Sequence, residues 1–115
     1  MQIAYIAGKY RDTHSYQTQE HIDKAKEVAK EVWKAGHVAI CPHLNSMNFE
    51  GINTEQHFLN GTLELLRRCD ALILVPGWET SQGTLGEIKE AKALDIPIFQ
   101  SVDNFLDFCY SKETT

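Results

Sequence analysis

Short apolar runs alternate with longer amphipathic segments along this sequence, and that alternation restricts the fold more than any other feature. Four apolar runs fit β-strands, at residues 2–7, 37–41, 71–76 and 97–101. The third run is apolar throughout, as is typical of a strand buried on both faces of a sheet. Apolar residues recurring at three- and four-residue spacing predict helices over about residues 16–35, 54–68, 84–94 and 104–110.

This order of elements predicts an α/β fold with a doubly wound parallel sheet of four to five strands. Such a sheet is flavodoxin-like or Rossmann-like and carries helices on both faces, because strand–helix crossovers are right-handed. The 115 residues form one expected domain, over 1–115. Ligands bind these sheets beyond the carboxyl ends of the strands, where the strand order reverses. We therefore expect a site at the loops 8–14, 43–53 and 76–87.

Composition excludes several classes of protein. Hydrophobic residues make up 43% and charged residues 23% of the chain, values that exclude a disordered or collagen-like chain. The net charge of −5 argues against duplex nucleic acid as a partner. The apolar runs are too short to span a membrane, and the first residues lack the basic region of a signal peptide. The odd number of cysteines, Cys41, Cys69 and Cys109, favours reduced thiols in a cytoplasmic protein.

The segment 76–87 contains the most informative motif. A glycine-containing loop that opens a helix offers free backbone N–H groups and the positive end of the helix dipole. Such a loop can hold a phosphate, with the Ser81 hydroxyl as a further donor, and the dipole would keep Glu87 ionised. An ionised, sequestered carboxylate suits attack on an anomeric carbon. The alternative is a capping box, in which Thr84 is the N-cap and Glu87 only folds back onto its own backbone.

Other candidate residues lie on the same expected edge of the sheet. Lys9 and Arg11 follow the first strand, where they either neutralise a phosphate or remain surface charges. His43 and Asn45 follow the second strand and are candidates for contacts to a base or ribose. Trp78 either stacks on a base, a sugar or a partner chain, or packs at a hinge.

Several familiar sites are excluded. The sequence lacks the glycine-rich dinucleotide fingerprint and the phosphate-loop lysine motif, so we expect no cofactor. A phospho-receiver domain needs acidic residues after its first strand, whereas residues 7–11 are basic. Cys41 and His43 lack zinc-ligand spacing and further ligands, so we expect no metal site.

Four segments together resemble the nucleoside 2-deoxyribosyltransferase-like proteins, in particular a small branch from bacteria and phages. They are residues 5–11, 36–43, 69–72 and 76–87, in the order and spacing typical of that family. The resemblance covers Gln2 to about Phe99 and includes Tyr5 and Gly8 in its first segment. From the sequence alone, Tyr5 is at least as well explained by core packing.

The resemblance implies roles for named residues. The glutamate at the position of Glu87 attacks the anomeric carbon and forms a glycosyl-enzyme intermediate, which passes to another base or to water. The order Ser81, Gly83, Glu87 resembles the pattern of deoxynucleoside 5′-monophosphate N-glycosidases, in which the serine accepts the phosphate. Thr62 stands where the family has an aspartate, and a threonine is no general acid near neutral pH. Glu55 or His57 are candidate substitutes.

Three functional hypotheses follow. The first is an N-glycosidase or deoxyribosyltransferase that acts on a nucleotide with Glu87 as nucleophile. The second is a non-catalytic protein that binds a nucleoside, a nucleotide or a nucleotide-derived signal. The third is a structural subunit in which Glu87 only caps its helix. The resemblance also implies a homo-oligomer, a dimer or higher, with the apolar face of residues 105–110 as a candidate interface.

Overall fold

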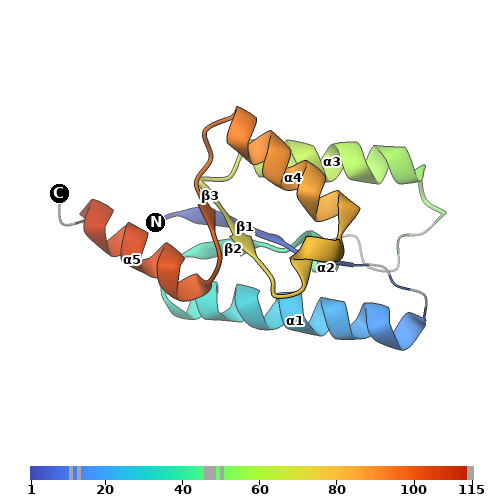
Figure 1. The fold of residues 1–115 in the computed structure, drawn as a ribbon, viewed down its shortest axis with the longest axis horizontal. Coiled ribbons are helices and arrows are strands. Elements are labelled where there is room, and N and C mark those ends of the chain that lie inside the picture. Colours follow the sequence, from blue (N-terminus) through green and yellow to red (C-terminus); the bar gives the residue numbers. More distant parts are fainter. Residues whose placement is uncertain (11, 13, 46–48, 50, 114–115) are drawn as a thin grey trace.

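The computed structural model describes residues 1–10, 12, 14–45, 49 and 51–113, and it shows one four-stranded sheet between two layers of helices (Figure 1). The strands are β1 (Ile3–Ala7), β2 (Val38–Ile40), β3 (Ala71–Leu74) and β4 (Ile98–Phe99). The helices are α1 (Ser15–Lys34), α2 (Pro42–Asn45), α3 (Glu55–Arg67), α4 (Gln82–Ala93) and α5 (Val102–Glu113), with a 3-10 turn, η1 (Trp78–Thr80), before α4. All strand pairs are parallel, in the order β2-β1-β3-β4. The predicted doubly wound α/β fold is confirmed, with four strands.

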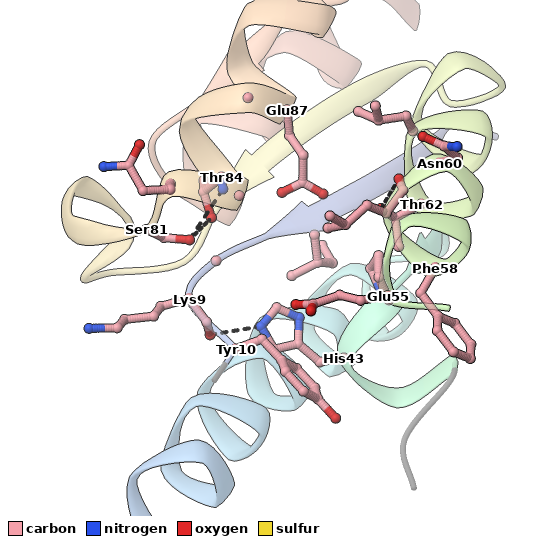
Figure 2. A pocket seen from close by; sticks show the side chains of 18 of the residues that line it. Lys9, Tyr10, His43, Glu55, Phe58, Asn60, Thr62, Ser81, Thr84 and Glu87 are labelled. Atoms are coloured by element: carbon pink, nitrogen blue, oxygen red, sulfur yellow. Dashed lines mark hydrogen bonds between the residues drawn. The ribbon is translucent and has the colours of Figure 1, made fainter. Parts of the chain in front are cut away.

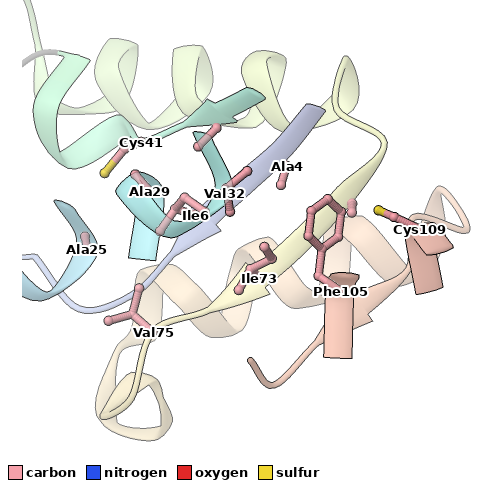
Figure 3. Packing of buried hydrophobic residues seen from close by; sticks show 12 residues of the cluster. Ala4, Ile6, Ala25, Ala29, Val32, Cys41, Ile73, Val75, Phe105 and Cys109 are labelled. Atoms are coloured by element: carbon pink, nitrogen blue, oxygen red, sulfur yellow. The ribbon is translucent and has the colours of Figure 1, made fainter. Parts of the chain in front are cut away.

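Successive residues of the central strands supply two separate cores, because side chains alternate between the faces of a sheet. Ala4 and Ile6 of β1 lie in the core that α1 and α5 cover (Figure 3). Tyr5 and Ala7 lie in the opposite core, under α3 and α4. Both faces of β1 and β3 are therefore buried, which explains the uninterrupted apolar run in β3.

The strand order reverses between β1 and β3, and the chain is tightly packed at that point. From β1 the chain crosses to β2 on one side, and it later returns to β3 on the other. A Cβ atom placed on Gly8, directly after β1, would lie 2.7 Å from Cβ of Val75, directly after β3. Only glycine allows these two strand ends to lie so close.

The structure departs from the sequence-based expectations in short elements. α2 begins at Pro42 and takes up the first residues of the expected loop 43–53, and η1 forms inside the expected loop between β3 and α4. Two apolar side chains of the expected interface on α5, Phe105 and Cys109, are instead buried in the protein's own core. Phe108 and Tyr110 remain exposed on that helix.

None of the helices in the described part of the chain combines the length and apolar character that crossing a bilayer requires.

Candidate functional site

A cavity of about 600 Å³ lies at the carboxyl ends of β1, β2 and β3, a volume within the range of small-molecule sites. Its floor follows β1, at Gly8, Lys9 and Tyr10. The N-terminal halves of α3 and α4 form facing walls (Figure 2). The cavity therefore lies at the edge of the sheet where the strand order reverses, as the sequence predicted.

Glu87 projects from the second turn of α4 into this cavity (Figure 2). The hydroxyl of Tyr5, a fully buried β1 residue, donates a hydrogen bond to Oε2 of Glu87. Burial raises the pKa of Glu87 to about 7, because a charged carboxylate loses its hydration there, while the Tyr5 hydrogen bond acts in the opposite direction. Burial and the neighbouring Glu87 raise the pKa of Tyr5, so its hydroxyl stays protonated.

The sequence predicted that the helix dipole keeps Glu87 ionised. For the protein without a ligand, this prediction is wrong below about pH 7, where the Glu87 carboxyl group is protonated. Desolvation outweighs the dipole five residues into the helix, since the dipole effect is confined to the first turn. Glu87 is a carboxyl group that gains and loses a proton near neutral pH. Groups with such a perturbed pKa in a cavity are candidates for proton transfer or nucleophilic attack.

The first turn of α4 is capped by Ser81, not by Thr84. Oγ of Ser81 accepts a hydrogen bond from the backbone N of Thr84 at 3.2 Å and from its Oγ1 at 2.9 Å. The capping-box alternative is therefore wrong, because Glu87 lies beyond the first turn and bonds to Tyr5 instead.

The backbone N–H groups of Gln82 and Gly83 have no acceptor within the described residues, and both residues line the cavity. Unsatisfied N–H groups at a helix start bind anions. Ser81, the candidate phosphate ligand, also lines the cavity.

His43 fixes the floor of the cavity. Its Nε2 donates to the backbone O of Lys9 at 2.8 Å, and its ring lies edge-on to Tyr10, with 5.2 Å between ring centroids. Burial lowers the pKa of His43, so the ring is neutral at pH 7. Its Nδ1 is buried and has no partner among the described residues. His43 therefore holds the β1–α1 turn rather than offering a free nitrogen to a ligand.

Lys9 lines the cavity on the side of Ser81 (Figure 2). Its Nζ lies 3.5 Å from Oδ2 of Asp12, a long ion pair between partly exposed groups. A pair of this kind contributes at most about 1 kcal/mol, so an anion can compete for the ammonium group.

The α3 wall combines apolar and polar side chains. Phe58, Leu59 and Leu63 give it an apolar surface. Thr62 lines the cavity too, but its Oγ1 donates to the backbone O of Leu59 at 2.8 Å. Glu55 also lines the cavity, whereas His57, the other candidate substitute for the family's aspartate, is not among the lining residues.

The structure does not bring all of the predicted residues together. Asn45 lies in a second hollow, between α1 and β2, with Lys26 and Trp33. Trp78 is half-buried against the core under α3 and α4, which matches the hinge-packing alternative. Arg11 falls outside the described residues.

Three aromatic residues that line the cavity, Tyr10, Phe49 and Phe58, are not among the site residues predicted from the sequence. Tyr10 and Phe49 lie in the loops 8–14 and 43–53, which are expected at the site, so their positions are a signal that could have found them. Phe58 lies in the predicted helix 54–68, where the sequence pattern does not distinguish an apolar side chain of the core from one that lines a cavity.

No group of three or more side chains in the described part of the chain is arranged to hold a metal ion.

Two solved structures share this fold. One is a 2-deoxyribosyltransferase from the psychrotolerant bacterium Bacillus psychrosaccharolyticus, with a TM-score of 0.61 and 19% identity. The other is a 2-desoxiribosyltransferase from Leishmania mexicana, with a TM-score of 0.59 and 22% identity. The matches cover 84% and 85% of this chain, and 69% and 62% of those two proteins. At such identities the likeness defines the fold class alone.

The chain belongs to the family described as "Domain of unknown function (DUF7768)", which matches residues 2–101. No match is found among curated proteins.

Proposed function

We propose that this protein cleaves the N-glycosidic bond of a deoxynucleoside 5′-monophosphate, with the carboxylate of Glu87 as the nucleophile. The observation that carries the proposal is the Glu87 carboxyl group, which projects into the cavity and is oriented by the Tyr5 hydroxyl. The shared fold with two 2-deoxyribosyltransferases supports it. The anomeric carbon bonds to the Glu87 oxygen as the base departs, and a second acceptor then takes the sugar.

The N-terminus of α4 is suited to the phosphate. Its free N–H groups at Gln82 and Gly83, the Ser81 hydroxyl and the nearby Lys9 all favour an anion. Glu87 lies four residues beyond Gly83, a rise of about 6 Å along a helix. One helical turn therefore separates the proposed phosphate site from the nucleophile, on the scale of the sugar that links the phosphate to the anomeric carbon.

The base is then directed to the opposite wall. Phe58, Leu59 and Leu63 provide the apolar surface on which a planar base can pack. Water excluded by this surface strengthens the electrostatic interactions at Glu87.

The test measures release of free base from a panel of deoxynucleoside monophosphates by liquid chromatography. We expect release by the unaltered protein and loss of at least about a hundredfold in Glu87→Gln, since removal of a nucleophile abolishes the covalent route. Glu90→Gln is the matched control: Glu90 lies on the same helix but outside the cavity, where it pairs with Arg67 at 2.9 Å. Equal release by Glu87→Gln and the unaltered protein would overturn the proposal.

The corresponding deoxynucleosides, which lack the phosphate group, test the proposed anion site at the start of α4. Nucleosides should react more slowly than their monophosphates, and Ser81→Ala should narrow that difference. If nucleosides and monophosphates react equally well, the α4 N-terminus is not a phosphate site.

A second candidate function is a protein that binds a nucleotide and leaves it intact. Thr62 favours this candidate, because its hydroxyl hydrogen is directed to the backbone of its own helix and a threonine is no general acid. Calorimetry with each monophosphate would then show binding, with the ligand recovered unchanged. A melting temperature that no nucleotide raises would exclude both functions.

The proposal includes assembly into a homo-oligomer. Leu59 of α3, which lines the cavity, is 47% exposed, and Leu85 of α4, which does not line it, is 40% exposed; a second subunit would cover such apolar side chains. Sedimentation should show a dimer or a larger assembly at micromolar concentration, and a monomer would contradict this part of the proposal.

A further inference from the structure

The strand β2 forms one edge of the sheet, and its outer side carries backbone groups without a partner. On the inner side, Val38 donates its backbone N–H to the O of Gln2 in the chain before β1, at 3.0 Å. Successive residues of a strand direct their backbone groups to opposite sides, so Ala39 directs its N–H and C=O away from β1. Neither group has a hydrogen-bond partner in the described part of the chain. An edge of this kind is a template for a further strand.

The residues on either side of Ala39 extend this edge by one group each. The N–H of His37 is bonded to the O of Val32 at 3.2 Å, and the O of Cys41 accepts from the N of Leu44 at 3.0 Å. The C=O of His37 and the N–H of Cys41 remain, and both are directed outward like the groups of Ala39.

A second copy of β2 fits these groups when it runs antiparallel and is centred on Ala39. Two hydrogen bonds would join Ala39 to the partner's Ala39, and two more would join each His37 C=O to the Cys41 N–H of the other copy. The groups already bonded within the chain, His37 N–H and Cys41 C=O, would face each other and need no new partner. The unpaired groups of this edge are therefore complementary to themselves.

A hollow of about 530 Å³ borders the same edge, between α1, β2 and α2. Trp33 lies at its one end, near the end of α1 and the start of β2, and is 56% exposed. Lys26 lies seven residues earlier on α1, about 10 Å along the helix axis. It lies toward the other end of the hollow, where Leu44 of α2 follows β2.

A two-fold axis at Ala39 exchanges these two ends, because the paired strands run in opposite directions. The indole of Trp33 in one subunit would then lie at the Lys26 end of the partner's hollow, and the reverse contact would form at the same time. An ammonium group attracts the face of an indole, and Leu44 adds apolar contact. A peptide from another protein would meet the backbone groups equally well, but it would leave the exposed indole and the ammonium group without this mutual fit.

We propose that two copies of this chain pair through β2, with Trp33 of each subunit seated in the hollow of the other. The two four-stranded sheets then join into one of eight strands. A stable interface buries about 800 Å² on each partner, so the α1 face from Lys26 to Trp33 must contribute beside the edge strand. The proposal assigns a face to the homo-oligomer proposed above, and it does not depend on the reaction at Glu87.

Sedimentation of Trp33→Lys tests the contact between the side chains. The new lysine would lie opposite the partner's Lys26, and the repulsion should raise the dissociation constant of the dimer at least about tenfold. Adding Lys26→Glu restores an opposite-charge pair across the axis and should recover most of this loss, which a folding defect would not allow. Tyr16→Lys is the matched control, since Tyr16 is an aromatic residue of α1 that is 62% exposed and lies outside the hollow.

Ala39→Pro tests the backbone pairing. Proline removes the outward N–H of residue 39 and leaves the inward hydrogen bonds of β2, as is tolerated on an edge strand. The dimer should weaken at least about tenfold, because two of the four hydrogen bonds across the interface are lost. Circular dichroism checks that this variant folds. If it does not fold, Trp33→Lys and its recovery by Lys26→Glu decide the test.

Fluorescence reports on the position of Trp33 itself. The chain has two tryptophans, so Trp78→Phe leaves Trp33 as the single one. Its emission should shift to longer wavelength when the protein is diluted below the dissociation constant, because the indole then leaves the hollow and meets water. Emission that stays the same while the dimer dissociates would overturn the seat proposed for Trp33.

The outcomes separate this inference from the function proposed above. A monomer at micromolar concentration overturns the β2 contact and the proposed assembly, whereas base release by that monomer would leave the proposed reaction standing. An assembly that Trp33→Lys and Tyr16→Lys leave equally intact overturns the β2 contact alone. If Trp33→Lys dissociates the dimer and Lys26→Glu recovers nothing, the two-fold arrangement about Ala39 is overturned.

Discussion

Replacing Glu87 by glutamine should remove a pH-dependent loss of stability. Burial raises the pKa of Glu87 from 4.5 to about 7, so the folded protein binds this proton more tightly than the unfolded chain does. The stabilising contribution is complete below about pH 4.5 and is lost as the pH rises through about 7. At about 1.4 kcal/mol for each pKa unit, the loss amounts to about 3 kcal/mol. Glutamine has the same shape, does not titrate, and still accepts the Tyr5 hydrogen bond.

The assay is urea unfolding of both proteins, followed by circular dichroism from about pH 4 to about pH 8. The free energy of unfolding of Glu87→Gln minus that of the unaltered protein should grow by about 3 kcal/mol across this range. Other titrating groups are shared by the two proteins and cancel in the difference. Glu31→Gln, at an exposed position of α1, should show a difference that hardly changes with pH. If the free energies of unfolding of Glu87→Gln and the unaltered protein changed with pH in parallel, the inference that burial disfavours the charged form of Glu87 would be refuted.

Two further variants test the site and its packing. Tyr5→Phe removes the hydrogen bond that lowers the pKa of Glu87. In the unaltered protein, the rate of base release should rise with pH through about 7 as Glu87 ionises. In the variant, the midpoint of this rise should lie at a higher pH. A pH–rate profile checks this, and a midpoint at the same or lower pH would contradict it. Gly8→Ala should cost about 1–3 kcal/mol in urea unfolding, because its new Cβ would lie 2.7 Å from Val75. Gly86→Ala is the control, because a Cβ atom there meets nothing within 4 Å, and it should leave the free energy of unfolding unchanged or raise it by up to about 1 kcal/mol. If both variants lost the same stability, the close approach of the two strand ends would not explain the loss in Gly8→Ala.

The sheet was predictable because each strand is a compact apolar run and each long helix has an apolar stripe. The start of α4 was less predictable, since Ser81 and Thr84 are both good N-cap residues three positions apart. Nothing local in the sequence decides between them. In the folded chain, Ser81 is extended and accepts from both the backbone N and the hydroxyl of Thr84.

The position of Asn45 shows why a candidate site cannot be read from proximity in sequence. In an extended loop, His43 and Asn45 would point the same way, as alternate residues do. They lie instead in the short helix α2, where two residues are separated by about 200° around the axis. His43 therefore reaches the cavity and Asn45 the hollow beside α1.

The raised pKa of Glu87 also depends on long-range structure, since it requires burial and a partner 82 positions away. The sequence identifies Glu87 as a candidate, whereas the environment of its carboxyl group is set only when β1 and α4 pack together.

The two halves of α3 are attached to the molecule unequally. Leu63, Leu65 and Leu66 pack into the core at its carboxyl end, while the half that begins at Glu55 has no buried residue and serves as a cavity wall. Displacing the amino-terminal half of α3 would therefore uncover less apolar surface than displacing its carboxyl-terminal half. A molecule that binds between α3 and α4 meets α3 at the end that contributes least to the core.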